Sequence, residues 1–204
     1  GPGELQIELD RRLIQERINS LKKDLKKIIK RRDNQRSNRK KNINTSYALV
    51  GYTNSGKSTL FNKLTKKNEY AKDELFATLD TKISKLFLPS KKATIIDTVG
   101  FISNIPTQLI DAFKATLEEV NESDILINVV DINDMNFRDK IRTTKKTLLS
   151  TGVSEDKVKN MITVFNKIDT FGDRKFKNTK SRVYLSALNG VGVEEFRDIL
   201  SSSY

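Results

Sequence analysis

The sequence contains neither cysteine nor histidine among its 204 residues. Without cysteine the chain can form no disulfide bond and no thiolate metal site, a composition compatible with a reducing compartment. Without histidine it lacks the commonest metal ligand and the commonest general base of enzymes. Any chemistry must therefore depend on carboxylates, lysines, hydroxyl groups, backbone amides or a bound cation.

Long apolar stretches are also missing. No run of about 18 apolar residues occurs, so we expect no membrane-spanning helix. The first residues, Gly-Pro-Gly, do not form a charged stretch that leads into an apolar one, as in a secretory signal.

The net charge of +12 is concentrated near the N-terminus. Between Ser20 and Lys41 there are eleven basic and two acidic residues, which gives +9 in 22 residues. Residues 1–19 sum to −1, and residues 42–204 hold 24 basic and 20 acidic side chains. Such a dense field of one sign can be a solvated helix surface, but it is also the kind that binds phosphate backbones.

The first 44 residues are expected to form a long basic helical segment. Apolar residues recur with an average spacing of ~3.5, which indicates a narrow seam along one side of a helix. This seam consists of Ile14, Ile18, Leu21, Leu25 and Ile28. It could pack on the rest of the chain or on a partner helix. Residues 34–44 resemble a polar linker, so we place a domain boundary between residues 1–44 and 45–204.

Residues 45–204 alternate short apolar runs with amphipathic stretches. We expect strands at 47–51, 82–88, 93–96, 125–130, 161–165 and 183–185, and helices at 57–67, 106–121, 137–150 and 193–201. This alternation predicts an α/β fold, with a mostly parallel sheet covered by helices on both faces.

The first strand leads into a phosphate-binding pattern, G-x-x-x-x-G-K-[ST]. It reads Gly51-Tyr52-Thr53-Asn54-Ser55-Gly56-Lys57-Ser58, followed by Thr59. The loop lies between a strand and a helix, where backbone amides and the positive helix end can surround phosphates. Lys57 would lie between the β- and γ-phosphates, and the Ser58 hydroxyl would bind Mg²⁺. The domain is therefore expected to be a P-loop nucleotide-binding domain.

Three later motifs follow predicted strands. These motifs are Asp97-Thr98-Val99-Gly100, Asn166-Lys167-Ile168-Asp169 and Ser186-Ala187-Leu188. Asp97 can hold the water shell of Mg²⁺, and the Gly100 amide can approach the γ-phosphate. The Asp169 carboxylate can accept hydrogen bonds from guanine N1 and N2, which adenine does not offer. The order of the motifs thus predicts a G domain that binds GTP and GDP.

Taken together, these residues resemble the HflX family of ribosome-associated GTPases. The resemblance rests on the loop G-Y-T-N-S-G-K-S-T, on Phe76-Ala77-Thr78-Leu79-Asp80 at the switch I position, and on Asp97-Thr-Val-Gly-Phe101. The segment Gly1-Pro-Gly-Glu4-x-x-Ile7-Glu8-x-Asp10-Arg11-Arg12 also resembles the family's helical linker. The resemblance covers nearly the whole chain and implies a further domain before Gly1.

The resemblance implies roles for several residues. Thr78 would give its hydroxyl to Mg²⁺ and its amide to the γ-phosphate, with Thr81 as a competitor. Phe101 stands where other GTPases carry a water-orienting glutamine, so unaided hydrolysis should be slow, although the ring could also simply pack in the core. Asn54 resembles the asparagine of potassium-activated GTPases and could help to hold K⁺, or it could only order the loop.

The expected catalytic residues are therefore Lys57, Thr78 and Asn54. The expected metal ligands are Ser58 and Thr78 for Mg²⁺, Asp97 for Mg²⁺ through water, and Asn54 for K⁺. The residues expected at the nucleotide are Gly51, Tyr52, Thr53, Asn54, Ser55, Gly56, Lys57, Ser58, Thr59, Phe76, Ala77, Thr78, Leu79, Asp80, Asp97, Thr98, Val99, Gly100, Asn166, Lys167, Ile168, Asp169, Ser186, Ala187 and Leu188.

By the same resemblance, the chain would be a cytoplasmic, monomeric GTPase that associates with the large ribosomal subunit. Its rRNA contact would lie between Lys22 and Lys41, and its role would be to split or rescue ribosomes under stress. Two alternatives stay open: a GTPase in tRNA modification or ribosome assembly, and a coiled-coil adaptor whose nucleotide is structural.

Overall fold

The computed structural model describes residues 10–17, 19–20, 45–65, 82–98, 100, 118–172 and 174–202. The chain forms two compact units, Gly1–Asn44 and Thr45–Tyr204. Within the described residues, no helix is both long enough and apolar enough to cross a bilayer.

In the first unit, residues 10–17 and 19–20 are helical. Arg12 and Glu16 form an ion pair one turn apart, as in a solvent-exposed helix. Ile14, the first residue of the predicted seam, is 60% exposed. The other seam positions, Ile18 to Ile28, and the basic residues from Lys22 to Lys41 lie outside the described residues.

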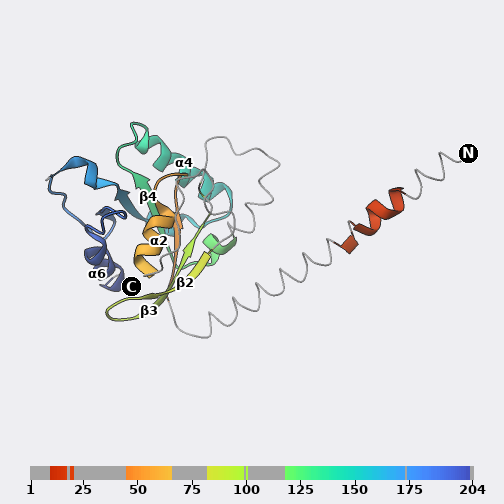
Figure 1. Ribbon diagram of the computed structural model, residues 1–204, viewed down its shortest axis with the longest axis horizontal. Helices are drawn as coiled ribbons and strands as arrows, with labels where there is room; N and C mark the ends of the chain where they lie inside the picture. Colours follow the sequence, from red (N-terminus) through yellow and green to blue (C-terminus); the bar gives the residue numbers. More distant parts are fainter. Residues whose placement is uncertain are drawn as a thin grey trace, which may run out of the picture. The chain divides into compact units, whose positions relative to one another are not determined.

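The second unit is built on a sheet of six strands within its described residues, in the order β2-β3-β1-β4-β5-β6 (Figure 1). The strands are β1 (Thr45–Val50), β2 (Lys82–Phe87), β3 (Lys92–Asp97), β4 (Ile125–Asp131), β5 (Ile162–Asn166) and β6 (Arg182–Tyr184). Among the strands described, only the β2–β3 hairpin is antiparallel, and the other four pairings are parallel. The predicted mostly parallel α/β fold is confirmed.

The helices of this unit are α2 (Lys57–Thr65), α4 (Phe137–Ser150), α5 (Glu155–Lys159), a 3₁₀ turn η1 (Ile168–Phe171) and α6 (Val193–Ser202). Residues 118–122, the described end of the predicted helix 106–121, are also helical. The sequence did not predict α5 or η1. Helix α5 has only five residues, too few to show periodicity, and its N-cap is Ser154, whose hydroxyl accepts a hydrogen bond from the Lys157 amide at 3.4 Å.

Both faces of the sheet are buried, and β1 contributes to both. Tyr47 and Leu49 pack in a core with Phe61 of α2 and Phe196 of α6. Their neighbours Ala48 and Val50 pack in a second core with Leu148 of α4 and Val158 of α5. Because successive side chains of a strand point to opposite faces, the continuous apolar run of β1 is what a doubly covered strand requires.

The carboxyl ends of β1, β3, β4 and β5 lie at one edge of the sheet, since these strands run parallel. Ligands of open α/β sheets bind at this edge. The loops that follow these four strands therefore share one neighbourhood.

A buried arginine of α6 connects this helix to the C-terminal end of α2. Arg197 is 5% exposed, and its Nη2 donates to the carbonyl oxygens of Leu64 at 2.5 Å and Lys63 at 3.3 Å. Its Nη1 donates to the carbonyl oxygen of Phe87 at 3.1 Å. The last carbonyls of a helix have no partners within the helix, so Arg197 supplies donors that α2 itself cannot.

We expect Arg197→Lys to lower the free energy of unfolding by about 1–3 kcal/mol, because one ammonium cannot reach three carbonyls and leaves buried acceptors unsatisfied. Urea denaturation monitored by circular dichroism measures the change. Arg142→Lys, at an exposed position of α4, is the matched control. Equal unfolding midpoints for the two variants would contradict the bracing role of Arg197.

Candidate functional site

The loop between β1 and α2 has the shape of a phosphate-binding loop. Gly56 has a φ of +90°, and a Cβ there would lie 2.1 Å from the Asn166 Nδ2 atom. Asn54 has a φ of 60°, in the left-handed region that asparagine tolerates better than most residues. Only glycine lets the loop approach Asn166 so closely, which explains the second glycine of the pattern.

Lys57 is the first residue of α2, and its side chain folds back onto the phosphate loop. Its Nζ donates to the carbonyl oxygen of Tyr52 at 2.7 Å, and the side chain is buried. Burial lowers the pKa of Lys57 to about 8, and the nearby Asp97 carboxylate opposes that shift. The loop thus holds a buried amine that an anion would keep charged.

Ser58 and Asp97 meet beside this amine. The Ser58 hydroxyl donates to Asp97 Oδ2 at 2.7 Å, and Asp97, the last residue of β3, is fully buried. The next residue, Thr98, donates its hydroxyl to the carbonyl oxygen of Leu49 at 2.6 Å, which anchors the end of β3 to β1. A hydroxyl and a carboxylate are the oxygen ligands that Mg²⁺ prefers, so this pair suits a magnesium ion.

Gly100 continues this segment against the phosphate loop. A Cβ at Gly100 would lie 2.8 Å from Thr53 Cγ2 and 2.9 Å from the Thr53 backbone nitrogen. The close approach brings the Asp97–Gly100 motif against the phosphate loop. Val99 and Phe101, on either side of Gly100, lie outside the described residues.

Asn166 joins the phosphate loop to the two later motifs. Its Nδ2 donates to the carbonyl oxygen of Ser55 at 2.9 Å, and its Oδ1 accepts from the Ala187 amide at 2.9 Å. The Ser186 hydroxyl donates to Asp169 Oδ1 at 2.6 Å. Four motifs that are far apart in the sequence therefore meet at one edge of the sheet. The Leu188 side chain points outward and is 69% exposed.

A second group of residues, which no sequence motif indicated, supports the 166–169 loop. Lys167 has a φ of 69°, and its Nζ lies 2.8 Å from Asp131 Oδ2 at the end of β4. The Asn133 Nδ2 donates to Asp131 Oδ1 at 3.2 Å and to the carbonyl oxygen of Lys167 at 3.3 Å. The Thr170 hydroxyl donates to Asn133 Oδ1 at 2.7 Å.

A signal for this support was available in the sequence. Asp131 directly follows an apolar strand, as Asp97 does, and such a carboxylate lies at the ligand-binding edge of a parallel sheet. No local pattern identified its partner, because Lys167 lies 36 positions further along the chain.

The expected switch I residues, Phe76, Ala77, Thr78, Leu79 and Asp80, lie outside the described residues. So does the competing Thr81. Their predicted contacts with Mg²⁺ and the γ-phosphate stay predictions.

Comparisons with known proteins agree with this geometry. The family described as "50S ribosome-binding GTPase" matches residues 46–167, and the family described as "GTP-binding GTPase Middle Region" matches residues 1–39. GTPase HflX of Caldanaerobacter subterraneus subsp. tengcongensis is 43% identical over 201 residues, which are 98% of this chain and 46% of that protein. GTPase HflX of Escherichia coli (strain K12) is 38% identical over 208 residues, 98% of this chain and 48% of that protein.

A solved structure shares the fold. The crystal structure of a GTP-binding protein from Sulfolobus solfataricus in complex with GDP is 30% identical, with a TM-score of 0.62. The match covers 85% of this chain and 57% of that one. The chain spans about half the length of the two curated relatives.

The support of Lys167 by Asp131 leads to a prediction. We expect Asp131→Asn to weaken GDP binding about three- to tenfold, because a partly exposed ion pair contributes about 1 kcal/mol and Lys167 loses its charged partner. Titration with a fluorescent GDP analogue measures the affinity. Asp139→Asn is the control, since Asp139 pairs with Arg142 on the exposed surface of α4. Unchanged GDP affinity in Asp131→Asn would refute the supporting role.

The low pKa of Lys57, about 8, leads to a second prediction. A phosphate beside the amine favours its charged form, so binding takes up a proton where Lys57 is otherwise neutral. The GDP affinity should be constant below about pH 7 and fall up to about tenfold per pH unit above pH 8. Lys57→Arg stays charged, so its affinity, although weaker, should change much less between pH 7 and 9. The same slope in both proteins would contradict this assignment.

Proposed function

The chain belongs to the family of 50S ribosome-binding GTPases, within its HflX group, and we propose that it binds and hydrolyses GTP as a switch on the large ribosomal subunit. The observation that carries the nucleotide part is the Asn166 side chain, which bonds the phosphate loop at Ser55 and the 186–188 loop at Ala187. This amide joins the part of the site that suits phosphate to the part that suits guanine.

In this proposal the phosphate loop and Lys57 hold the phosphates of GTP. The buried Lys57 amine and the amides at the start of α2 give a preorganised positive environment that needs no rearrangement when charge develops. Asp169 accepts from the guanine base, held in place by the Ser186 hydroxyl at 2.6 Å. Ser58 and Asp97 fit Mg²⁺, with Thr78 completing the set, and the ion would neutralise phosphate charge when bound.

We propose that rapid hydrolysis requires a partner or a cation to supply what the residues of the site lack. Phe101 carries no group that can orient a water molecule, so this position cannot do what a catalytic glutamine does. Asn54 is exposed at the tip of the phosphate loop, with a φ of 60°. There its side-chain oxygen is available to a K⁺ ion beside the phosphates, which would supply the positive charge that an arginine provides in other GTPases.

The ribosomal part of the proposal is supported by charge. The description of the family that matches residues 46–167 names the 50S ribosome, and the stretch from Ser20 to Lys41 carries +9. A field of this density binds nucleic acid phosphates with an affinity that falls steeply with salt. We further propose, from the HflX relatives, a role in splitting or rescuing stalled ribosomes.

A single assay tests the function. GTP turnover by the 204-residue chain should be slow alone, rise at least tenfold with 50S subunits, and be faster in KCl than in NaCl. A variant with Lys22, Lys23, Lys26 and Lys27 changed to Gln should lose most of the 50S stimulation at moderate salt. Each lysine that is removed takes away a phosphate contact and the affinity for RNA that this contact provides.

The control for this assay carries the same charge change elsewhere. Lys145, Lys146, Lys177 and Lys180 are exposed on the G domain, and their change to Gln should leave the stimulation intact. Turnover that is indifferent to 50S subunits would refute the ribosomal proposal. Tight GTP binding with no multiple turnover under any condition would instead favour a structural nucleotide.

A further inference from the structure

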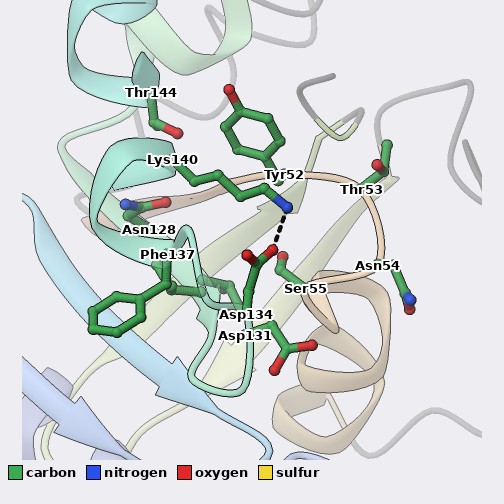
Figure 2. Close-up of a pocket in the computed structure, with 12 residues that line it drawn as sticks. Tyr52, Thr53, Asn54, Ser55, Asn128, Asp131, Asp134, Phe137, Lys140 and Thr144 are labelled. Carbon is green, nitrogen blue, oxygen red and sulfur yellow. Dashed lines mark hydrogen bonds and ion pairs between the residues drawn. The ribbon is translucent and has the colours of Figure 1, made fainter. Parts of the chain in front are cut away.

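Phe87, the last residue of β2, is the only exposed aromatic residue in the described part of the chain. Its side chain is 67% exposed, and its ring contacts no other ring or cation among the described residues. The Tyr52 ring, in contrast, lies beside a small cavity behind the phosphate loop and is covered by Lys140, which pairs with Asp134 (Figure 2). Single exposed apolar residues are common on protein surfaces, so the surroundings of Phe87 decide what it indicates.

Lysines surround this ring on its own face of the β2–β3 hairpin. Residues 82–92 contain four lysines and no acidic residue. Phe87 pairs directly with Lys92 of β3, and Lys85 lies two positions before Phe87 on β2. Such positions share one face of a sheet, and directly opposite Cβ atoms are ~5 Å apart. Lys85 and Lys92 are exposed and form no ion pair with any described residue, so both charges are available to a partner.

Helix α6 holds the tip of the hairpin in place. Arg197 Nη1 donates to the carbonyl oxygen of Phe87 at 3.1 Å, and the Ser90 amide donates to Ser201 Oγ at 3.0 Å. The backbone that carries the ring is therefore fixed before any partner arrives. A partner does not have to order the hairpin, which lowers the entropic cost of binding.

The basic N-terminal segment joins the sheet at the same end as this tip. Thr45, the first residue of β1, pairs with Ala93, which directly follows Lys92. Only residues 42–44 separate Thr45 from the stretch Ser20–Lys41. Asp97 and the nucleotide motifs lie at the other end of β3, five positions from Lys92, or ~16 Å at ~3.3 Å per residue. The hairpin tip thus adds positive charge next to the entry of the basic segment and away from the nucleotide site.

Lysines beside an uncovered aromatic ring favour a single-stranded nucleic acid as the partner. Phosphates bind the lysines, and every base offers a π-face to the ring. A base must be unpaired to stack in this way, as in the loops and bulges of RNA. A membrane-binding face would instead present several apolar side chains, whereas here one ring lies among lysines. An acidic protein segment would pair with the lysines and leave the ring without a partner.

We propose that the tip of the β2–β3 hairpin is a second RNA contact, in which Phe87 stacks on an unpaired base while Lys85 and Lys92 bind the flanking phosphates. This contact rests on the proposed function, which makes RNA the partner of the chain. It differs from the contact of the stretch Ser20–Lys41, which contains no aromatic residue and binds phosphates alone. The hairpin therefore adds a requirement for single-stranded RNA.

Tryptophan fluorescence measures the stacking, because the chain contains no tryptophan. Phe87→Trp introduces one indole ring at the hairpin. Leu149→Trp introduces one at an exposed position of α4 that also lies one turn from two exposed lysines, Lys145 and Lys146. A twelve-nucleotide oligouridylate should quench roughly a third or more of the Phe87→Trp emission saturably, and should leave the Leu149→Trp emission unchanged. Equal quenching of both variants, or none in Phe87→Trp, would overturn the contact.

Two further probes distinguish stacking from other kinds of contact. An oligonucleotide of the same length without bases keeps the phosphates, and it should not quench Phe87→Trp. Quenching by this probe would contradict the stacking on a base. Vesicles that contain phosphatidylserine should leave the emission wavelength of Phe87→Trp unchanged. A blue shift with these vesicles, without quenching by oligouridylate, would assign the hairpin to a membrane surface and overturn the RNA contact.

The two lysines are tested in the Phe87→Trp chain. Changing Lys85 and Lys92 to Gln should reduce the slope of log affinity against log salt concentration by about 1.4, since each phosphate contact with a single strand contributes about 0.7. The same change at Lys145 and Lys146 is the matched control and should leave the slope as it is. Equal slopes in the two variants would contradict the phosphate contacts of the hairpin.

GTP turnover keeps this contact distinguishable from the function on which it rests. Turnover without ribosomal subunits should be the same in all of these variants, because the hairpin tip lies at the far end of β3 from Asp97. Quenching of Phe87→Trp with no 50S stimulation of turnover would refute the ribosomal function and keep the RNA contact. Stimulation by 50S subunits without quenching would refute the hairpin contact alone.

Discussion

The side-chain amide of Asn166 is the contact on which the rest of the site depends. It uses both ends of one planar group, donating to Ser55 at 2.9 Å and accepting from Ala187 at 2.9 Å. Because it lies so close to the loop, position 56 has no room for a side chain. The glycine of one motif and the asparagine of another thus form a single structural requirement, although 110 positions separate them.

The sheet makes this contact possible. Parallel pairing brings the ends of β1, β3, β4 and β5 to one edge, and burial on both faces holds these ends rigidly. The same arrangement gives the phosphate loop two different sides. One side carries the Lys57 amine and the Ser58–Asp97 pair, and the other faces α4 across a small polar cavity. Ser55 lies between them, since its carbonyl oxygen accepts from Asn166 and the residue is also part of the cavity lining.

Much of the fold and of the nucleotide site could be predicted from the sequence. The six strands were predicted to within one or two residues, because buried parallel strands are short continuous apolar runs. Helix α5 and the turn η1 were missed, since elements of five and four residues are too short to show a periodicity. Asp131 and Asn133 were missed for a different reason. Their roles are defined by Lys167, a residue distant in the sequence, and not by any pattern around them.

The sequence by itself determined the class of protein, because a loop that binds phosphates requires glycine, lysine and hydroxyl residues at set spacings. It also determined where the apolar strands lie, because alternation and burial leave a local pattern. Only the tertiary structure decided which side chains support the 166–169 loop and how strongly burial shifts the pKa of Lys57. These properties arise from groups that become neighbours only when the sheet assembles, so no local pattern can encode them.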